Sequence, residues 1–229
     1  PARALSAACL CAAGAVLADQ PPPFSSDGLK GWTPEKIMGH KETVYAAAQD
    51  GAGQVVSAQC ADSASMLGWA GNVDLDKTPV LDWRWKVQQI YPGLDERVKG
   101  GSDFPARVYV VVGKKWMPWA MKTIEYAWSN GEHPAASWTS PYSGVMGQAV
   151  IVPVRSGADG VGDWQEQQRD VKADFKQFFG LDTDKIGAVA LMMTLPGGVA
   201  KAADTDVKFI LGKGQAWYGD VHFLPRAAK

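Results

Sequence analysis

Short segments in which apolar and polar residues alternate dominate the chain, and this is the pattern of half-buried β-strands. The alternation is clean over residues 80–87 and returns over residues 123–128. Residues 43–48 and 55–60 flank Asp50-Gly51-Ala52-Gly53, a sequence that favours a hairpin turn. Further apolar runs, each ended by turn residues, cover 104–112, 148–154, 187–193 and 217–224. Together these runs predict an all-β fold, an antiparallel β-sandwich of the jelly-roll kind.

One segment has the spacing of an amphipathic helix. In residues 165–179, the apolar side chains of Val171, Phe175 and Phe179 recur at helical intervals, and Gly180 follows at the position that commonly ends a helix. We therefore expect one short helix beside the strands.

The first eighteen residues have the layout of a signal peptide. Arg3 supplies the positive start, residues 5–17 are apolar but too short to span a bilayer, and Val16 and Ala18 are small residues placed for cleavage before Asp19. A lipoprotein cut at Cys9 or Cys11 is the alternative, although the usual leucine three residues earlier is absent. We expect export to the periplasm or beyond, with no transmembrane segment once residues 1–18 are removed.

The remaining chain divides into two parts. Residues 19–40 are rich in proline and glycine and are expected to be irregular, whereas residues 41–229 are expected to form a single β-sandwich domain.

The net charge of −1 offers no basic field for nucleic acid. Cys60 is the one cysteine after the predicted leader, so it has no internal disulfide partner, and we expect it to be buried.

A series of motifs occurs along the chain in a characteristic order: Thr43-Val44-Tyr45, Leu81-Asp82-Trp83-Arg84-Trp85-Lys86-Val87, Asp103-Phe104-Pro105-Ala106-Arg107-Val108-Tyr109-Val110, Ile124-Glu125-Tyr126-Ala127-Trp128, Trp164, Arg169-Asp170-Val171, Asp174-Phe175, Phe179-Gly180 and Trp217-Tyr218-Gly219-Asp220-Val221-His222-Phe223. This order and spacing resemble the bacterial family called domain of unknown function 3047. The resemblance covers about residues 32–224. It implies an exported, jelly-roll-like protein with no established activity, and its closing motif looks like the last strands of carbohydrate-binding jelly rolls, an analogy of fold.

The chain departs from the family pattern near its end. Members usually run from the penultimate strand directly into an acidic turn, but here residues 195–203 intervene before Asp204-Thr205-Asp206. Asp204 and Asp206 resemble the start of a calcium loop, yet Lys208 occupies the third ligand position. A structural Ca²⁺ is thus the weaker interpretation and a solvated turn the stronger one, so we expect no cofactor.

Alternation sorts the charged residues onto one face of three segments. Arg84, Arg107 and Glu125 all lie opposite the apolar side chains of their runs, with Tyr109 beside Arg107. If the three strands are neighbours, these residues form one charged patch. The alternative is a solvated cross-strand ladder, worth roughly 0.2–1 kcal/mol per pair.

This predicted patch has the chemistry of a site for a polar small molecule or a polysaccharide. Arginine forks bind hydroxyl or carboxylate oxygens, and aromatic rings stack on sugars. The candidate ligand-binding residues are Arg84, Arg107, Tyr109, Glu125, Trp164 and Arg169. Among the ten tryptophans, Trp83, Trp85 and Trp128 are expected in the core, and Trp116, Trp119 and Trp138 are candidates for an exposed rim.

No common catalytic motif occurs in the sequence, which lacks HExxH, GxSxG, CxxC and a P-loop. The first interpretation is therefore a non-catalytic, exported binding protein for a glycan or another polar ligand. The second is a polysaccharide-cleaving hydrolase or lyase, with Glu125 as base or nucleophile and Tyr109 as acid. The third is an envelope interaction protein that uses its exposed tryptophans as an interface.

Overall fold

A computed structural model of the chain describes residues 20–51, 53–114, 116–131, 136–144, 147–195 and 213–227. The predicted signal peptide and the acidic turn of Asp204 and Asp206 lie outside these residues. None of the helices in the described ranges is long and apolar enough to cross a membrane.

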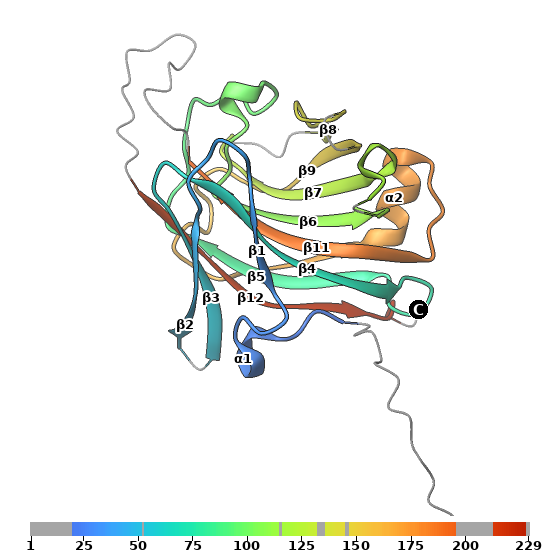
Figure 1. Cartoon of the computed structure of the whole chain (residues 1–229). Helices are drawn as coiled ribbons and strands as arrows, with labels where there is room; N and C mark the ends of the chain where they lie inside the picture. Colours follow the sequence, from blue (N-terminus) through green and yellow to red (C-terminus); the bar gives the residue numbers. More distant parts are fainter. Residues whose placement is uncertain are drawn as a thin grey trace, which may run out of the picture.

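Two β-sheets pack face to face, which confirms the predicted jelly-roll-like β-sandwich (Figure 1). The seven-stranded sheet has the order β1-β4-β11-β6-β7-β9-β8 and is built from β1 (Thr33–Lys36), β4 (Ala64–Asp74), β6 (Ala106–Val112), β7 (Lys122–Ser129), β8 (Trp138–Thr139), β9 (Gln148–Ser156) and β11 (Lys185–Thr194). The five-stranded sheet has the order β10-β5-β12-β3-β2 and is built from β2 (Val44–Asp50), β3 (Gly53–Cys60), β5 (Val80–Val87), β10 (Gln165–Asp170) and β12 (Gly214–Leu224).

One pair of strands departs from the predicted antiparallel pattern. Strands β7 and β9 are parallel, whereas the other pairs of named strands in the described ranges are antiparallel. A parallel pair needs a long connection that carries the chain back to the end where the first strand began. Residues 130–147 provide that connection.

In the described part of the chain, two α-helices accompany the strands: α1 (Phe24–Asp27) and α2 (Val171–Phe179). The predicted helix over 165–179 is correct only in its second part, because Gln165–Asp170 instead forms strand β10 and pairs with β5. Helix α2 begins where the Asp170 side chain accepts a hydrogen bond from the Ala173 N–H (2.9 Å), and it ends at the left-handed Gly180. The segment 19–40, which was expected to be irregular, contains α1 and β1.

The core between the sheets is rich in aromatic side chains. Trp83 and Trp85 of β5 project inward and meet Tyr126 and Trp128 of β7, with ring centroids 5.5 Å apart for Trp83–Tyr126 and 5.9 Å apart for Trp85–Trp128. The prediction that Trp83, Trp85 and Trp128 are core residues is therefore confirmed. Cys60 is also buried, as expected.

Sheet membership separates the predicted charged patch into two places. Arg84, Arg107 and Glu125 do point away from the apolar core, as their alternation predicted. However, β5 belongs to the five-stranded sheet, while β6 and β7 belong to the seven-stranded sheet. The prediction of one shared patch is wrong, because alternation fixes the face of a strand but not the sheet that the strand joins.

Candidate functional site

The outer face of the five-stranded sheet carries rows of polar side chains, and we call it the polar face. Strand register aligns Glu166 with Arg84, and Trp217 with Lys86. The outward residues from the three neighbouring strands are Glu166 and Gln168 of β10, Asp82, Arg84 and Lys86 of β5, and Trp217, Asp220 and His222 of β12.

Two half-buried indole rings lie on this polar face with cations beside them. The Arg84 guanidinium lies 4.5 Å from the ring centroid of Trp164, which precedes β10. The Lys86 ammonium lies 5.2 Å from the Trp164 centroid and 4.5 Å from that of Trp217. We call these four residues, with Asp50, the tryptophan cluster. Its rings are held in defined positions by cation–π contacts.

Asp50, at the end of β2, ties the cluster to the neighbouring hairpin. Its carboxylate accepts a hydrogen bond from the Trp164 indole N–H (2.7 Å) and pairs with the Lys86 ammonium. The hydrogen bond from Lys86 lowers the pKa of Asp50. Two strands that are distant in sequence, β2 and β5, therefore fix the orientation of Trp164.

Arg84 reaches across the sheet because β12 leaves room for it. A β-bulge lies between Tyr218 and Val221, and a Cβ atom at Gly219 would fall 2.6 Å from both Cγ and Nε of Arg84. The guanidinium end extends to Gly53 of β3, where a Cβ atom would lie 4.0 Å from Nη2. The Arg84 side chain can therefore cross β12 at residue 219 because glycine has no Cβ atom there.

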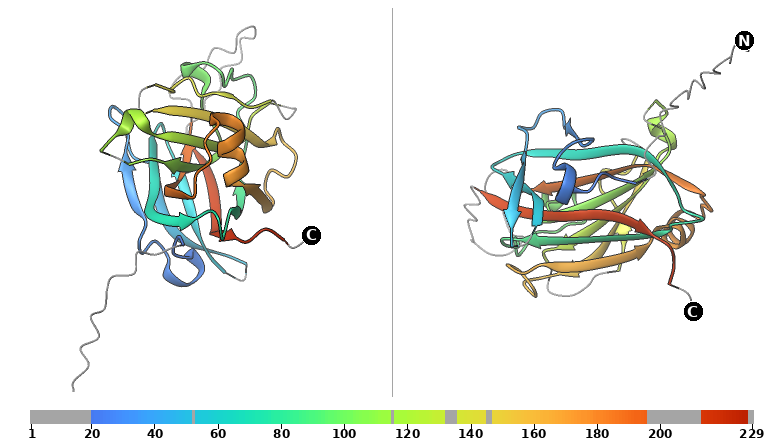
Figure 2. Two further views of the ribbon diagram at one scale, coloured as in Figure 1. Left: turned by 90° about the vertical axis from the view of Figure 1, so that its right-hand side faces the viewer. Right: turned by 90° about the horizontal axis from the view of Figure 1, so that it is seen from below.

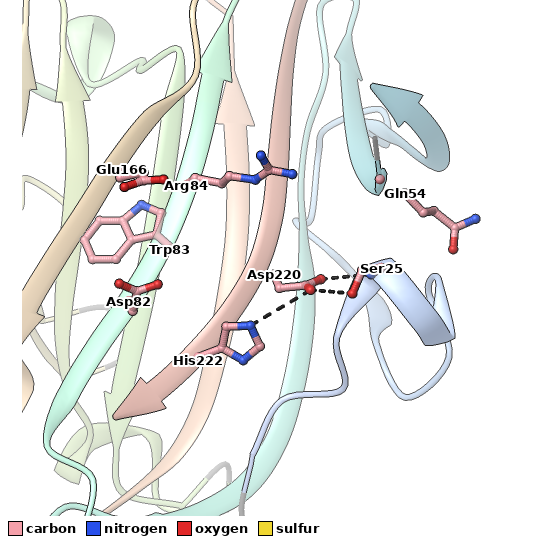
Figure 3. A pocket seen from close by; sticks show the side chains of 9 residues that line it. Ser25, Gln54, Asp82, Trp83, Arg84, Glu166, Asp220 and His222 are labelled. Carbon is pink, nitrogen blue, oxygen red and sulfur yellow. Dashed lines mark hydrogen bonds and ion pairs between the residues drawn. The ribbon is translucent and has the colours of Figure 1, made fainter. Parts of the chain in front are cut away.

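A hollow of about 330 Å³ adjoins the tryptophan cluster and shares Arg84 with it (Figure 3). Asp220 accepts hydrogen bonds from the backbone N–H (2.9 Å) and hydroxyl (2.5 Å) of Ser25 in α1, and its carboxylate lies 3.9 Å from the His222 imidazole. Across the hollow, Asp82 accepts a hydrogen bond from Gln168 (2.6 Å). The hollow is lined by Ser25, Gly53, Gln54, Asp82, Trp83, Arg84, Glu166, Asp220 and His222.

The polar face offers groups that suit a polyhydroxylated ligand. Carboxylates of Asp82, Glu166 and Asp220 accept hydrogen bonds from hydroxyl groups, Arg84 donates them, and the indoles supply apolar faces for stacking. Within the described ranges, no group of three or more His, Cys, Asp or Glu residues is placed to hold a metal ion.

Arg107, Tyr109 and Glu125 also lie together, but on the outer face of the other sheet. The Arg107 guanidinium pairs with Glu125 (3.1 Å) and lies 5.3 Å from the Tyr109 ring centroid and 4.9 Å from that of Phe104. Arg107 also donates a hydrogen bond to the Thr194 hydroxyl (3.2 Å). The exposed fractions of Arg107, Tyr109 and Glu125 are only 4%, 8% and 4%, so a ligand would find little of this group to touch.

Two further carboxyls lie near this buried guanidinium. Glu96 accepts hydrogen bonds from the Ser129 hydroxyl (2.5 Å) and from the Asn130 backbone N–H (2.6 Å), and burial raises its pKa. Burial also raises the pKa of Asp103, while the positive charge of Arg107 partly opposes that rise. The outward face of β6 and β7 thus holds a buried polar network, in contrast to the accessible polar face.

Arg169 belongs to neither outer face. It forms a two-pronged ion pair with Asp174 of α2, with N–O distances of 2.9 and 2.6 Å, and the same carboxylate accepts a hydrogen bond from the Tyr126 hydroxyl (2.7 Å). The six predicted site residues therefore occupy three places. The polar face holds Arg84 and Trp164. The outer face of the seven-stranded sheet holds Arg107, Tyr109 and Glu125. The third place is the contact between β10 and α2, where Arg169 pairs with Asp174.

A family model described as "Protein of unknown function (DUF3047)" matches residues 30–222. The chain belongs to this family. No curated protein matches the DUF3047 chain.

Several solved structures are similar to this DUF3047 protein in outline at low sequence identity. TmCBM61 in complex with β-1,4-galactotriose is 10% identical, with 90% of this chain and 95% of that chain covered and a TM-score of 0.39. The xyloglucanase domain of NopAA from Sinorhizobium fredii, in complex with cellobiose, is 9% identical (86% and 94% covered, TM-score 0.43). The endo-β-1,4-glucuronan lyase from Trichoderma reesei is 7% identical (83% and 93% covered, TM-score 0.40).

Proposed function

We propose that this protein is an exported, non-catalytic binding protein for a glycan or a similarly polar ligand, and that the polar face is its binding site. The single observation that carries the proposal is the tryptophan cluster beside an open polar hollow. Export is proposed from the signal-peptide pattern of residues 1–18.

The arrangement of the polar face favours a sugar over an apolar ligand. Sugars present hydroxyl groups around the ring edge and C–H groups on the ring faces, so they need hydrogen-bonding groups and flat aromatic surfaces side by side. The hollow supplies the first and Trp164 and Trp217 supply the second. Because Asp50, Arg84 and Lys86 hold the rings in place, little conformational entropy is lost on binding.

The surroundings of Glu125 and Tyr109, the two catalytic candidates in the sequence, favour binding over cleavage. A base or nucleophile needs contact with the substrate, but Glu125 is 4% exposed and its carboxylate is engaged by Arg107. Tyr109, the matching acid candidate, is 8% exposed, and burial raises its pKa well above the ordinary value. This pair lies on the opposite side of the sandwich from the polar face.

A glycan array followed by product analysis tests the proposal. The full chain is applied to neutral, acidic and amino-sugar polysaccharides, and each bound glycan is then incubated with the protein and analysed for chain length. We expect binding to a defined glycan class with no shortening of the chains.

Two results would contradict this proposal. Chains that shorten with wild-type protein, but not with Glu125→Gln, would identify a polysaccharide-cleaving enzyme. The absence of binding to any glycan, with the protein shown to be folded, would favour an envelope interaction protein instead.

A further inference from the structure

The loop between β6 and β7 exposes two tryptophans to solvent. Trp116 and Trp119 have exposed fractions of 68% and 72%, which confirms that both are surface residues. The loop reads Gly113-Lys114-Lys115-Trp116-Met117-Pro118-Trp119-Ala120-Met121 and is followed by Lys122. It projects from one end of the sandwich, where it is drawn in yellow-green (Figure 2).

Local contacts hold the described part of this loop in a compact shape. The Met117 N–H donates to the Lys114 carbonyl (2.8 Å), and the Met121 N–H donates to the Pro118 carbonyl (3.2 Å). Gly147 packs against the loop so closely that a Cβ atom there would lie 2.2 Å from the Met121 carbonyl oxygen. The two indoles are therefore presented by an ordered turn.

The charge of the loop is positive. Lys114, Lys115 and Lys122 lie within or beside it, and the sequence contains no Asp or Glu from residue 106 to residue 124. Lys114 lies 5.9 Å from the Trp116 ring centroid. Four aspartates at the same end of the sandwich form ion pairs with lysines that lie outside the loop. The pairs are Lys77–Asp74, Lys172–Asp76, Lys172–Asp182 and Lys185–Asp184.

Exposed tryptophans with flanking lysines match the chemistry of a lipid bilayer surface. The amphipathic indole ring prefers the level of the lipid headgroups, and lysine ammonium groups attract anionic headgroups. A protein partner fits less well, because a stable protein interface buries about 800 Å² on each side, far more than a loop of this length offers.

We propose that the 113–121 loop docks the protein onto the surface of an anionic phospholipid bilayer. Trp116 and Trp119 insert into the headgroup region, and Lys114 and Lys122 contact the headgroup phosphates. This inference is independent of glycan binding, because the loop extends from the seven-stranded sheet and the polar face belongs to the other sheet.

The test uses the full chain and vesicles of phosphatidylethanolamine and phosphatidylglycerol whose acyl chains are brominated. Bromine quenches the fluorescence of a tryptophan that enters the bilayer, and residues 1–18 contain no tryptophan. Quenching therefore reports the insertion of tryptophans that lie after residue 18, even if the N-terminal segment also binds lipid. The variants are Trp116→Ala/Trp119→Ala, Lys114→Glu/Lys115→Glu and, as a control, Met38→Ala, which changes a side chain that is 96% exposed.

We expect the wild-type protein and Met38→Ala to be quenched equally, with quenching that weakens as salt is added. The double tryptophan variant should lose quenching and bind at least about tenfold more weakly, and the charge-reversed variant should lose its preference for phosphatidylglycerol. Three results would each overturn the proposal. The first is wild-type protein that does not bind the vesicles, and the second is wild-type protein that sediments with them without being quenched. The third is a double tryptophan variant that is quenched as strongly as the wild-type protein.

Discussion

At the scale of single residues, the outward face of a strand does not guarantee contact with water. Arg107 and Glu125 point away from the main core, yet each is only 4% exposed. The guanidinium lies near the rings of Phe104 and Tyr109, in surroundings that exclude most water, and Glu125 at 3.1 Å balances its charge. Loss of either partner is therefore expected to lower the free energy of unfolding more than loss of one residue of a solvent-exposed cross-strand ion pair would.

Replacing Arg107 with methionine should therefore destabilise the protein strongly. The change leaves the Glu125 carboxylate buried without its partner, and we expect the free energy of unfolding to fall by about 3–5 kcal/mol. Urea denaturation at neutral pH measures this loss. Lys36→Met, which breaks a pair between two well-exposed side chains, is the control and should have a far smaller effect. Equal losses in the two variants would show that the Arg107 pair is no more important than a surface one.

Asp103 should make stability depend on pH. Burial raises its folded-state pKa above the ordinary value of 3.8, so the folded protein favours the protonated carboxyl more than the unfolded chain does. Its contribution is fully present below pH 3.8 and is lost as the pH rises through the folded-state pKa. Asp103→Asn should thus gain stability relative to wild type as the pH increases from 3.8 towards neutrality. Urea denaturation of both proteins at several pH values checks this, and a stability difference independent of pH would contradict it.

At the scale of strands and helices, the sequence predicts which side chains of a strand face the core better than it predicts which strands pair with each other. Alternation in β5 is matched by alternating burial along the strand, because side chains at successive positions must point to opposite faces. Pairing between strands is a long-range property. Strands β4 and β5 are consecutive in sequence but join different sheets, whereas β5 pairs with the distant β12. No local pattern contains that information, which is why the predicted patch combined residues from two sheets.

The hollow was missed for two further structural reasons. The β-bulge in β12 resets the alternation, so Val221 faces inward although it is an even number of residues from the outward Trp217, and Asp220 and His222 face outward. Ser25 lies on α1, in a segment whose proline and glycine content suggested no regular structure. The spacing of the Trp217-Tyr218-Gly219-Asp220-Val221-His222-Phe223 motif does not by itself indicate a bulge.

The bulge leads to a prediction about Gly219. A methyl group at this position would collide with the Arg84 side chain along its length, so Gly219→Ala should displace Arg84 from the polar face. We expect ligand affinity to fall about tenfold or more through the loss of hydrogen bonds from the guanidinium, with the fold preserved. Titration calorimetry measures the affinity. Gly100→Ala, where a Cβ atom meets nothing within 4 Å, is the control, and equal affinity of the two variants would contradict the proposed role of Arg84.

At the scale of the whole molecule, three surfaces of one sandwich have different chemistry. The outer side of the five-stranded sheet is polar, aromatic and open. Arg107 and Glu125, outward on the seven-stranded sheet, form a buried ion pair. The end of the sandwich beyond β6 and β7 presents exposed tryptophans and lysines. Because the end and the open side are separate, the protein can rest on a bilayer and bind a glycan at the same time under the two proposals.

The most direct test of the central claim is the affinity of Trp164→Ala for a glycan that the wild-type protein binds, measured by titration calorimetry. Trp119→Ala, which removes an exposed tryptophan outside the polar face, is the matched control. Our account predicts that Trp164→Ala binds about tenfold more weakly or worse, through the loss of ring stacking, while Trp119→Ala binds like wild type. Unchanged affinity of a correctly folded Trp164→Ala protein would show that the glycan binds elsewhere.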